Sequence, residues 1–142
     1  MRRLLVVLLV VLAVPASAHV TSTGLATLEI DGSRLTYRLT LVAAEQEEEN
    51  VRLLDGVANG DTMAVARAAA AMRQAARFDW GGEACTPGRI RFQGSRTGDG
   101  KMMLEMALSC VKSTGPLRIR DEWSDVLGSH FQTLMSVRVP ER

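Results

Sequence analysis

The chain has 142 residues, of which 46% are hydrophobic and 23% are charged. This composition, with 17 basic against 16 acidic residues, excludes an intrinsically disordered protein, which would have fewer apolar residues and a larger net charge. A formal net charge of +1 without a run of Lys and Arg argues against a nucleic-acid partner, and the length is that of one domain.

The N-terminus has the pattern of a secretory signal peptide. Arg2 and Arg3 precede the apolar residues 4–14, and the small residues Ala16 and Ala18 occupy the positions that a signal peptidase recognises. A retained membrane anchor would need nearly twice that apolar length. We therefore expect cleavage after Ala18, which removes residues 1–18 and leaves residues 19–142 as a single extracytoplasmic β-rich domain, periplasmic or secreted.

Alternating hydrophobicity predicts a β-hairpin at the start of the mature chain. Apolar side chains occupy every second position of residues 26–30 and again of residues 35–41. Asp31 and Gly32 lie between the two runs, and both residue types accept the positive φ of a tight hairpin turn.

An Ala-rich segment then favours a helix of about four turns over residues 63–78. The polar residues 59–62 offer its N-cap, and an apolar stripe would face the sheet. The stripe consists of Val65, Ala69, Met72 and Ala76. The run 45–50, which precedes this helix and contains four glutamates, favours a solvated loop or the start of a helix.

A second hairpin and two short strands complete the chain. Residues 89–93 alternate, residues 98–100 form a Gly-Asp-Gly turn, and the even-numbered residues of 102–110 face inward. Shorter alternating runs cover residues 117–120 and 131–139, where Phe131, Met135, Val137 and Val139 are expected on one face. These patterns predict a mostly-β, α+β fold: an antiparallel, sandwich-like sheet of about six strands with one inserted Ala-rich helix.

The two cysteines, Cys85 and Cys110, are expected to form a disulfide. An even number of cysteines in an exported chain is first interpreted as a bridge, which would stabilise the fold by about 3 kcal/mol. Neither cysteine has a neighbouring His or a C-x-x-C spacing that would make it a reactive thiol.

The two histidines, His19 and His130, form the candidate metal site. Cleavage after Ala18 makes His19 the first residue, so that its α-amine and imidazole can chelate one metal ion together. The imidazole of His130 would complete a three-nitrogen site suited to copper. The alternative is that both histidines are ordinary surface residues, and cleavage after Ala16 would remove the chelate. Met102, Met103 and Met106 could bind a cuprous ion through their thioethers, but core packing is the better interpretation for Met102 and Met106.

The sequence contains no recognisable catalytic motif. It has no G-x-S-x-G elbow, no phosphate-binding Gly loop, no H-E-x-x-H and no Cys paired with His at a known spacing. We therefore expect a protein that is not an enzyme, unless a bound copper ion performs the chemistry.

The chain resembles the extracytoplasmic N-terminal domain of HupE/UreJ-type membrane proteins, a family associated with hydrogenase and urease accessory functions and with metal transport. The resemblance lies in His19 directly after the signal peptide, the early hairpin 25–41, Cys110 at the end of a strand and the closing segment 125–134. Because those proteins continue into transmembrane helices and this sequence ends at Arg142, the resemblance implies a free-standing sensor or metal-delivery module. A weaker similarity to CopC-like histidine-brace copper carriers rests on His19 and the β-rich pattern.

Three functions follow as hypotheses. The first is a secreted or periplasmic accessory domain that holds copper or nickel through His19 and His130 without turnover, in association with an integral membrane protein. The alternatives are a metal-free module that docks a membrane partner and a histidine-brace copper oxygenase.

Overall fold

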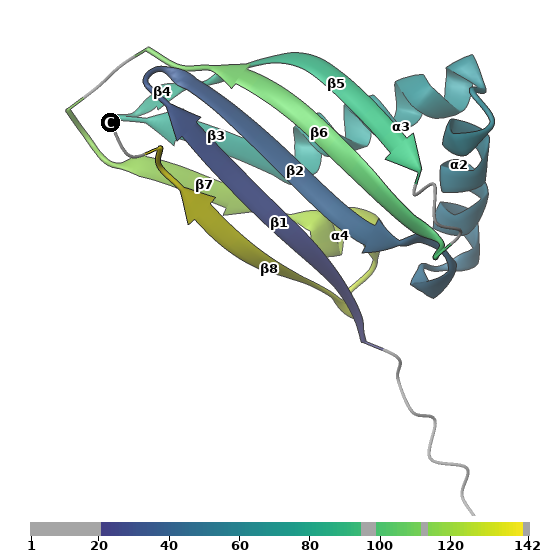
Figure 1. Cartoon of the computed structure of the whole chain (residues 1–142). Coiled ribbons are helices and arrows are strands. Elements are labelled where there is room, and N and C mark those ends of the chain that lie inside the picture. Colours follow the sequence, from purple (N-terminus) through teal and green to yellow (C-terminus); the bar gives the residue numbers. More distant parts are fainter. Residues whose placement is uncertain (1–20, 95–98, 112–113, 141–142) are drawn as a thin grey trace, which may run out of the picture.

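The computed structural model describes residues 21–94, 99–111 and 114–140, which form two β-sheets with helices packed beside them (Figure 1). The larger sheet has the strand order β5-β6-β2-β1-β8, and the smaller one has the order β4-β3-β7. The mostly-β, α+β class predicted from the sequence is therefore confirmed. The strands are β1 (Ser22–Asp31), β2 (Arg34–Val42), β3 (Ala76–Trp80), β4 (Glu83–Ala84), β5 (Thr86–Gly94), β6 (Lys101–Ser109), β7 (Leu117–Asp121) and β8 (Phe131–Arg138). The helices are the 3-10 helix η1 (Ala43–Glu45), α2 (Glu48–Ala58), α3 (Thr62–Ala75) and α4 (Trp123–Leu127).

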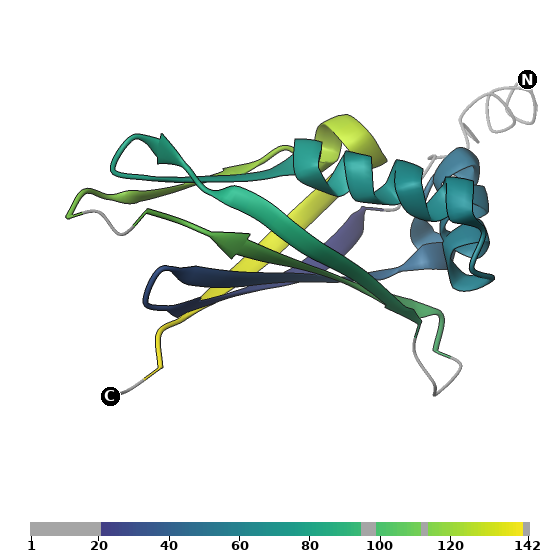
Figure 2. The same ribbon diagram turned by 90° about the horizontal axis from the view of Figure 1, so that it is seen from above.

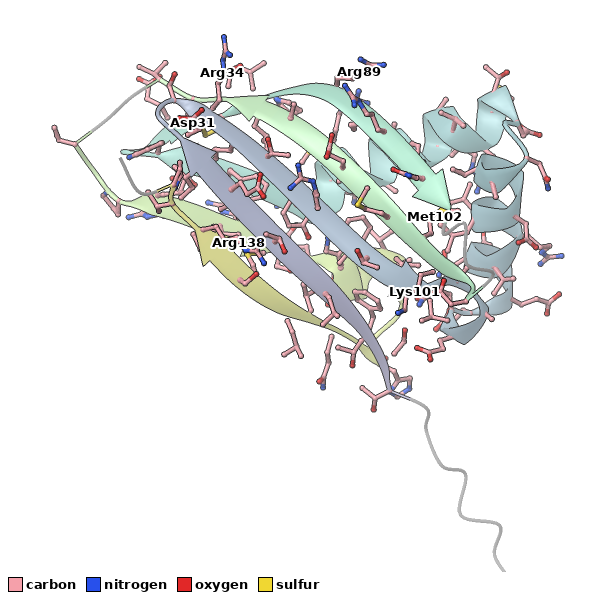
Figure 3. All side chains as sticks on the ribbon, viewed as in Figure 1. Asp31, Arg34, Arg89, Lys101, Met102 and Arg138 are labelled. Carbon is pink, nitrogen blue, oxygen red and sulfur yellow. A yellow bond between two sulfur atoms is a disulfide. The ribbon has the colours of Figure 1, made fainter. Side chains whose placement is uncertain are left out.

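The first predicted hairpin is present as β1 and β2, but its turn lies one residue later than expected. Asp31 pairs with Arg34, so that Gly32 and Ser33 are the two central residues (Figure 3). Of these two, only Gly32 has a positive φ, 60°. The glycine alone supplies the left-handed conformation that a two-residue hairpin turn requires.

The predicted inward faces of β2 and β6 form the centre of the core. The even-numbered residues of β6 are buried, and the odd-numbered residues of β2 are buried opposite them in antiparallel register. Methionines are therefore core residues at two of these positions, since Met102 is 4% exposed and Met106 is fully buried. The largest fully buried side chains of the described chain are Trp123, Tyr37, Leu28, Leu35, Leu39, Leu41, Met72 and Met106.

The last strand, β8, runs parallel to β1 at the edge of the larger sheet, and this pair departs from the expected antiparallel arrangement. Phe131 is buried as predicted, and Met135 packs against the core. Val137 and Val139 were expected on the inner face, but they are 52% and 67% exposed. The alternation is correct, yet this edge of the sheet extends past the elements that would cover it.

The helical region contains two helices where one was predicted, and they pack against each other at one end of the molecule (Figure 2). The acidic segment begins α2, which buries Leu54 and Val57. The Ala-rich helix α3 ends at Ala75, and the residues after it form β3. Its buried residues, Ala68, Met72 and Ala75, therefore differ from the predicted stripe except at Met72.

The N-cap of α3 gives a first testable prediction. The Asp61 carboxylate accepts hydrogen bonds from the backbone N–H groups of Met63 (2.8 Å) and Ala64 (2.9 Å). Asp61→Ala should therefore lower the free energy of unfolding by about 1 kcal/mol, measured by urea unfolding. Asp55→Ala removes an exposed carboxylate from α2 and is the control. Equal losses in both variants would contradict a capping role.

The predicted disulfide is present between Cys85 and Cys110, whose Cα atoms are 4.3 Å apart. Cys85 connects β4 of the smaller sheet to β5 of the larger sheet, and Cys110 directly follows β6. The bridge therefore links the connection between the two sheets to the end of β6. In the described part of the chain, no helix is long and apolar enough to cross a lipid bilayer.

Candidate metal site

The candidate site lies at the end of the larger sheet where β1 and β8 both begin. Because these strands are parallel, Ser22 at the start of β1 is aligned with Phe131 at the start of β8. His130 directly precedes Phe131 and is exposed in the turn that leads into β8. The other predicted ligand, His19, lies outside the described residues.

Gln46 connects the start of β1 to the end of β2. Its side-chain Nε2 donates hydrogen bonds to Ser22 Oγ at 2.7 Å and to the Val42 carbonyl at 3.0 Å. Because a carbonyl oxygen can only accept, these two contacts fix the orientation of the carboxamide. Gln46 is 8% exposed and Ser22 is 6% exposed, so the contact is buried.

The Gln46 Oε1 atom has no hydrogen-bond partner. Among the described residues, every other buried side-chain nitrogen or oxygen has a hydrogen-bond partner. A buried polar atom without a partner costs about 1–3 kcal/mol, so native proteins keep few of them. This end of the sheet therefore offers an acceptor for an N–H group, a water molecule or a cation.

A carboxylate lies beside the same turn. The Glu47 side chain packs against Gly128, where a Cβ atom would overlap with its Oε1. Gly128 also has a φ of 106°, which side-chain-bearing residues rarely adopt. The glycine thus permits the close approach of Glu47 to the turn that carries His130.

Within the described residues, no group of three or more His, Cys, Asp or Glu side chains has the geometry to hold a metal ion. The nearby acidic residues have structural partners: Asp121 Oδ1 accepts from the Trp123 N–H at 3.3 Å, and Glu122 pairs with Arg77 at 2.6 Å. Of the two histidines predicted as metal ligands, the described part of the chain includes only His130.

The sequence did not point to Ser22, Gln46 or Glu47 as parts of this site. None of them lies in a motif. Ser22 and Gln46 meet because β1 and β2 form a hairpin, and Glu47 meets Gly128 only in the folded chain. No known protein family matches the chain, and no curated protein matches it either. The functional interpretation therefore depends on the residues themselves.

Proposed function

We propose that the protein is an extracytoplasmic accessory domain that binds a copper or nickel ion reversibly and performs no catalytic turnover. The α-amine and imidazole of His19 and the imidazole of His130 are its ligands, after cleavage of a signal peptide behind Ala18. Nitrogen ligands of this kind suit both metals. The resemblance to the HupE/UreJ-type domains supports the same class of function.

The observation that carries this proposal is the parallel alignment of Ser22 with Phe131. His19 precedes Ser22 by three positions, and three residues span at most about 11 Å. His130 directly precedes the residue with which Ser22 is aligned. A chelate shared by the two histidines would therefore form at this end of the sheet, where β1 and β8 begin.

The polar groups around this end also favour a cation. Glu47 contributes a negative charge beside the His130 turn, and Gln46 Oε1 is an oxygen without a partner next to Ser22. An amide oxygen accepts an N–H bond from a neighbouring amine or binds a metal ion directly. Either contact would satisfy Gln46 and help to hold the chain start near His130.

The disulfide supports export. A Cys85–Cys110 bridge is typical of an oxidising compartment and is compatible with a periplasmic or secreted protein.

The proposal predicts that His130→Ala weakens cupric binding by at least about 100-fold, because a lost ligand costs more than a lost outer-shell partner. Isothermal titration of the secreted protein with Cu²⁺ measures this, after mass spectrometry has shown that His19 is the first residue. The fold should be unchanged, since His130 is exposed. Gln132→Ala, also exposed and two positions further on, is the matched control. Unchanged affinity in His130→Ala would reject the site.

A second candidate function, docking of a membrane partner without a metal, is favoured by one apolar pair. Leu25 and Leu134 lie directly opposite each other on β1 and β8, and they are 59% and 62% exposed. Exposed apolar side chains that adjoin one another are typical of a binding surface. Protein purified without copper or nickel, together with unchanged affinity in His130→Ala, would favour this function over the first.

A further inference from the structure

The outer face of the smaller sheet carries three arginines. Strands β3 and β7 are antiparallel, with Arg77 directly opposite Arg120 and Asp79 directly opposite Arg118. These residues alternate with Phe78 and Ile119, which belong to the core. Side chains that are directly opposite on one face have Cβ atoms about 5 Å apart. Three guanidinium groups and one carboxylate therefore occupy a small area of the surface.

A surface cavity of about 310 Å³ opens among these side chains. It is lined by the three arginines together with Asp79, Phe78, Gly82 and Ala84. Gly82 and Ala84 contribute almost no side-chain volume, so polar groups of the strands can reach into the space. The cavity has room for a small ligand, and positive charge dominates its lining.

The charges of this cavity are only partly balanced by the protein. Glu122 holds Arg77, with its two carboxylate oxygens 2.6 and 2.8 Å from Arg77 Nη2. Arg118 and Arg120 form no ion pair with any described residue, although Asp79 is the cross-strand neighbour of Arg118. Arg120 is directly opposite Arg77, and like charges in this arrangement destabilise a sheet. An anion bound between these two side chains would reduce that repulsion.

We propose that Arg118 and Arg120, with Arg77 beside them, bind a phosphate-type oxyanion, either a free phosphate group or the phosphate of a lipid headgroup. A guanidinium presents parallel N–H donors that match the oxygens of such a group. Arg118 and Arg120 are two positions apart on one strand face, so both can direct their donors to one ligand. The site is separate from the proposed metal ligands, and it does not depend on metal binding.

The test compares two double variants of the full chain. Arg118→Gln with Arg120→Gln removes the proposed site, and Arg89→Gln with Arg91→Gln removes the same charge at the same spacing from β5, which forms an edge of the larger sheet (Figure 3). Arg91 lies opposite Glu105, in contrast to Arg120, which lies opposite Arg77. One arm titrates inorganic phosphate and follows the backbone amide NMR signals of β3 and β7. The other arm measures co-sedimentation with phosphatidylglycerol vesicles against phosphatidylcholine vesicles.

We expect wild-type protein and the β5 variant to bind at least one of the two probes, and the β7 variant to bind it at least tenfold more weakly, with a thermal midpoint no lower than that of the wild type. Binding of inorganic phosphate would identify a free oxyanion as sufficient, whereas binding of anionic vesicles alone would identify the lipid headgroup. Added salt should weaken binding in either arm. Absence of binding to both probes, or an equal loss in the two double variants, would overturn the proposal.

Discussion

Replacing both cysteines, Cys85→Ala and Cys110→Ala, is expected to lower the free energy of unfolding by about 3 kcal/mol. The disulfide closes a loop with a sequence separation of 25 residues, and in the chain-entropy model a loop of that size gives a stabilisation of this order. Both cysteines are buried. Alanine is therefore a better replacement than serine, whose hydroxyl group would be buried without a hydrogen-bond partner. The backbone N–H groups of Cys85 and Cys110 also donate to the carbonyls of Phe78 and Ser33. The sheet connections should therefore persist in the folded variant.

Urea unfolding of three samples checks this expectation: oxidised wild type, wild type in dithiothreitol and the double alanine variant. The reduced wild type and the variant should have similar midpoints, both below that of the oxidised protein. If the oxidised protein and the variant unfolded at the same midpoint, the disulfide would contribute nothing to the stability of the fold.

The sequence was most informative about strands that have one buried face and one solvent-exposed face. In β2 and β6, a shift of one residue would place every apolar side chain in water, so hydrophobic alternation alone defined the inward faces. The same alternation identified β7 and β8, but it carried no information about their neighbours. The parallel pairing of β8 with β1 brings together the first and the last described strands, and no local sequence pattern encodes this pairing.

The end of α3 shows why local propensity was insufficient. The Ala-rich pattern continues past Ala75, and a helix prediction continued with it. The chain instead forms β3, in which Phe78 packs against Tyr37 with ring centroids 5.4 Å apart and pairs with Ile119 of β7. Burial of an aromatic side chain and a ladder of strand hydrogen bonds outweigh the few tenths of a kcal/mol per residue that favour helix.

The candidate site was predictable only in part. The chemistry of two histidines, one of them next to an expected cleavage site, is readable from the sequence. The surroundings of His130 are not, because Glu47 meets Gly128 only in the folded chain and Gln46 contacts Ser22 only through the pairing of β1 with β2. Gln46 in particular resembles any polar residue after a strand, and only its buried contact with Ser22 distinguishes it.

The buried pair of Tyr37 and Trp123 leads to the second large effect, a loss of stability in alkaline solution. Trp123 Nε1 donates a hydrogen bond to the Tyr37 hydroxyl at 2.8 Å, and both side chains lie in the core. Burial raises the pKa of the Tyr37 phenol far above its ordinary value, and the charge of Asp121 adds to the effect, while the Trp123 hydrogen bond opposes it. The folded protein therefore keeps this proton at a pH where an unfolded chain releases it.

The sign of the pH dependence follows from this difference. A tyrosine in an unfolded chain ionises near pH 10, so the unfolded state binds fewer protons than the folded state above that pH. The free energy of unfolding is then expected to fall by up to about 1.4 kcal/mol per pH unit as the pH rises from about 10. Below pH 10 both states are protonated, and Tyr37 contributes no pH dependence.

Tyr37 is the one tyrosine of the sequence, which makes the measurement direct. Tyrosinate absorbance should appear together with the loss of near-ultraviolet circular dichroism, well above pH 10, because ionisation requires unfolding. Tyr37→Phe should flatten the dependence of stability on pH above 10. At neutral pH the same variant should be about 1–3 kcal/mol less stable, since Trp123 Nε1 loses its acceptor. Tyrosinate absorbance with a midpoint near pH 10 in a protein that is still folded would show that the phenol is accessible to solvent, and the buried pair could then not account for alkaline unfolding.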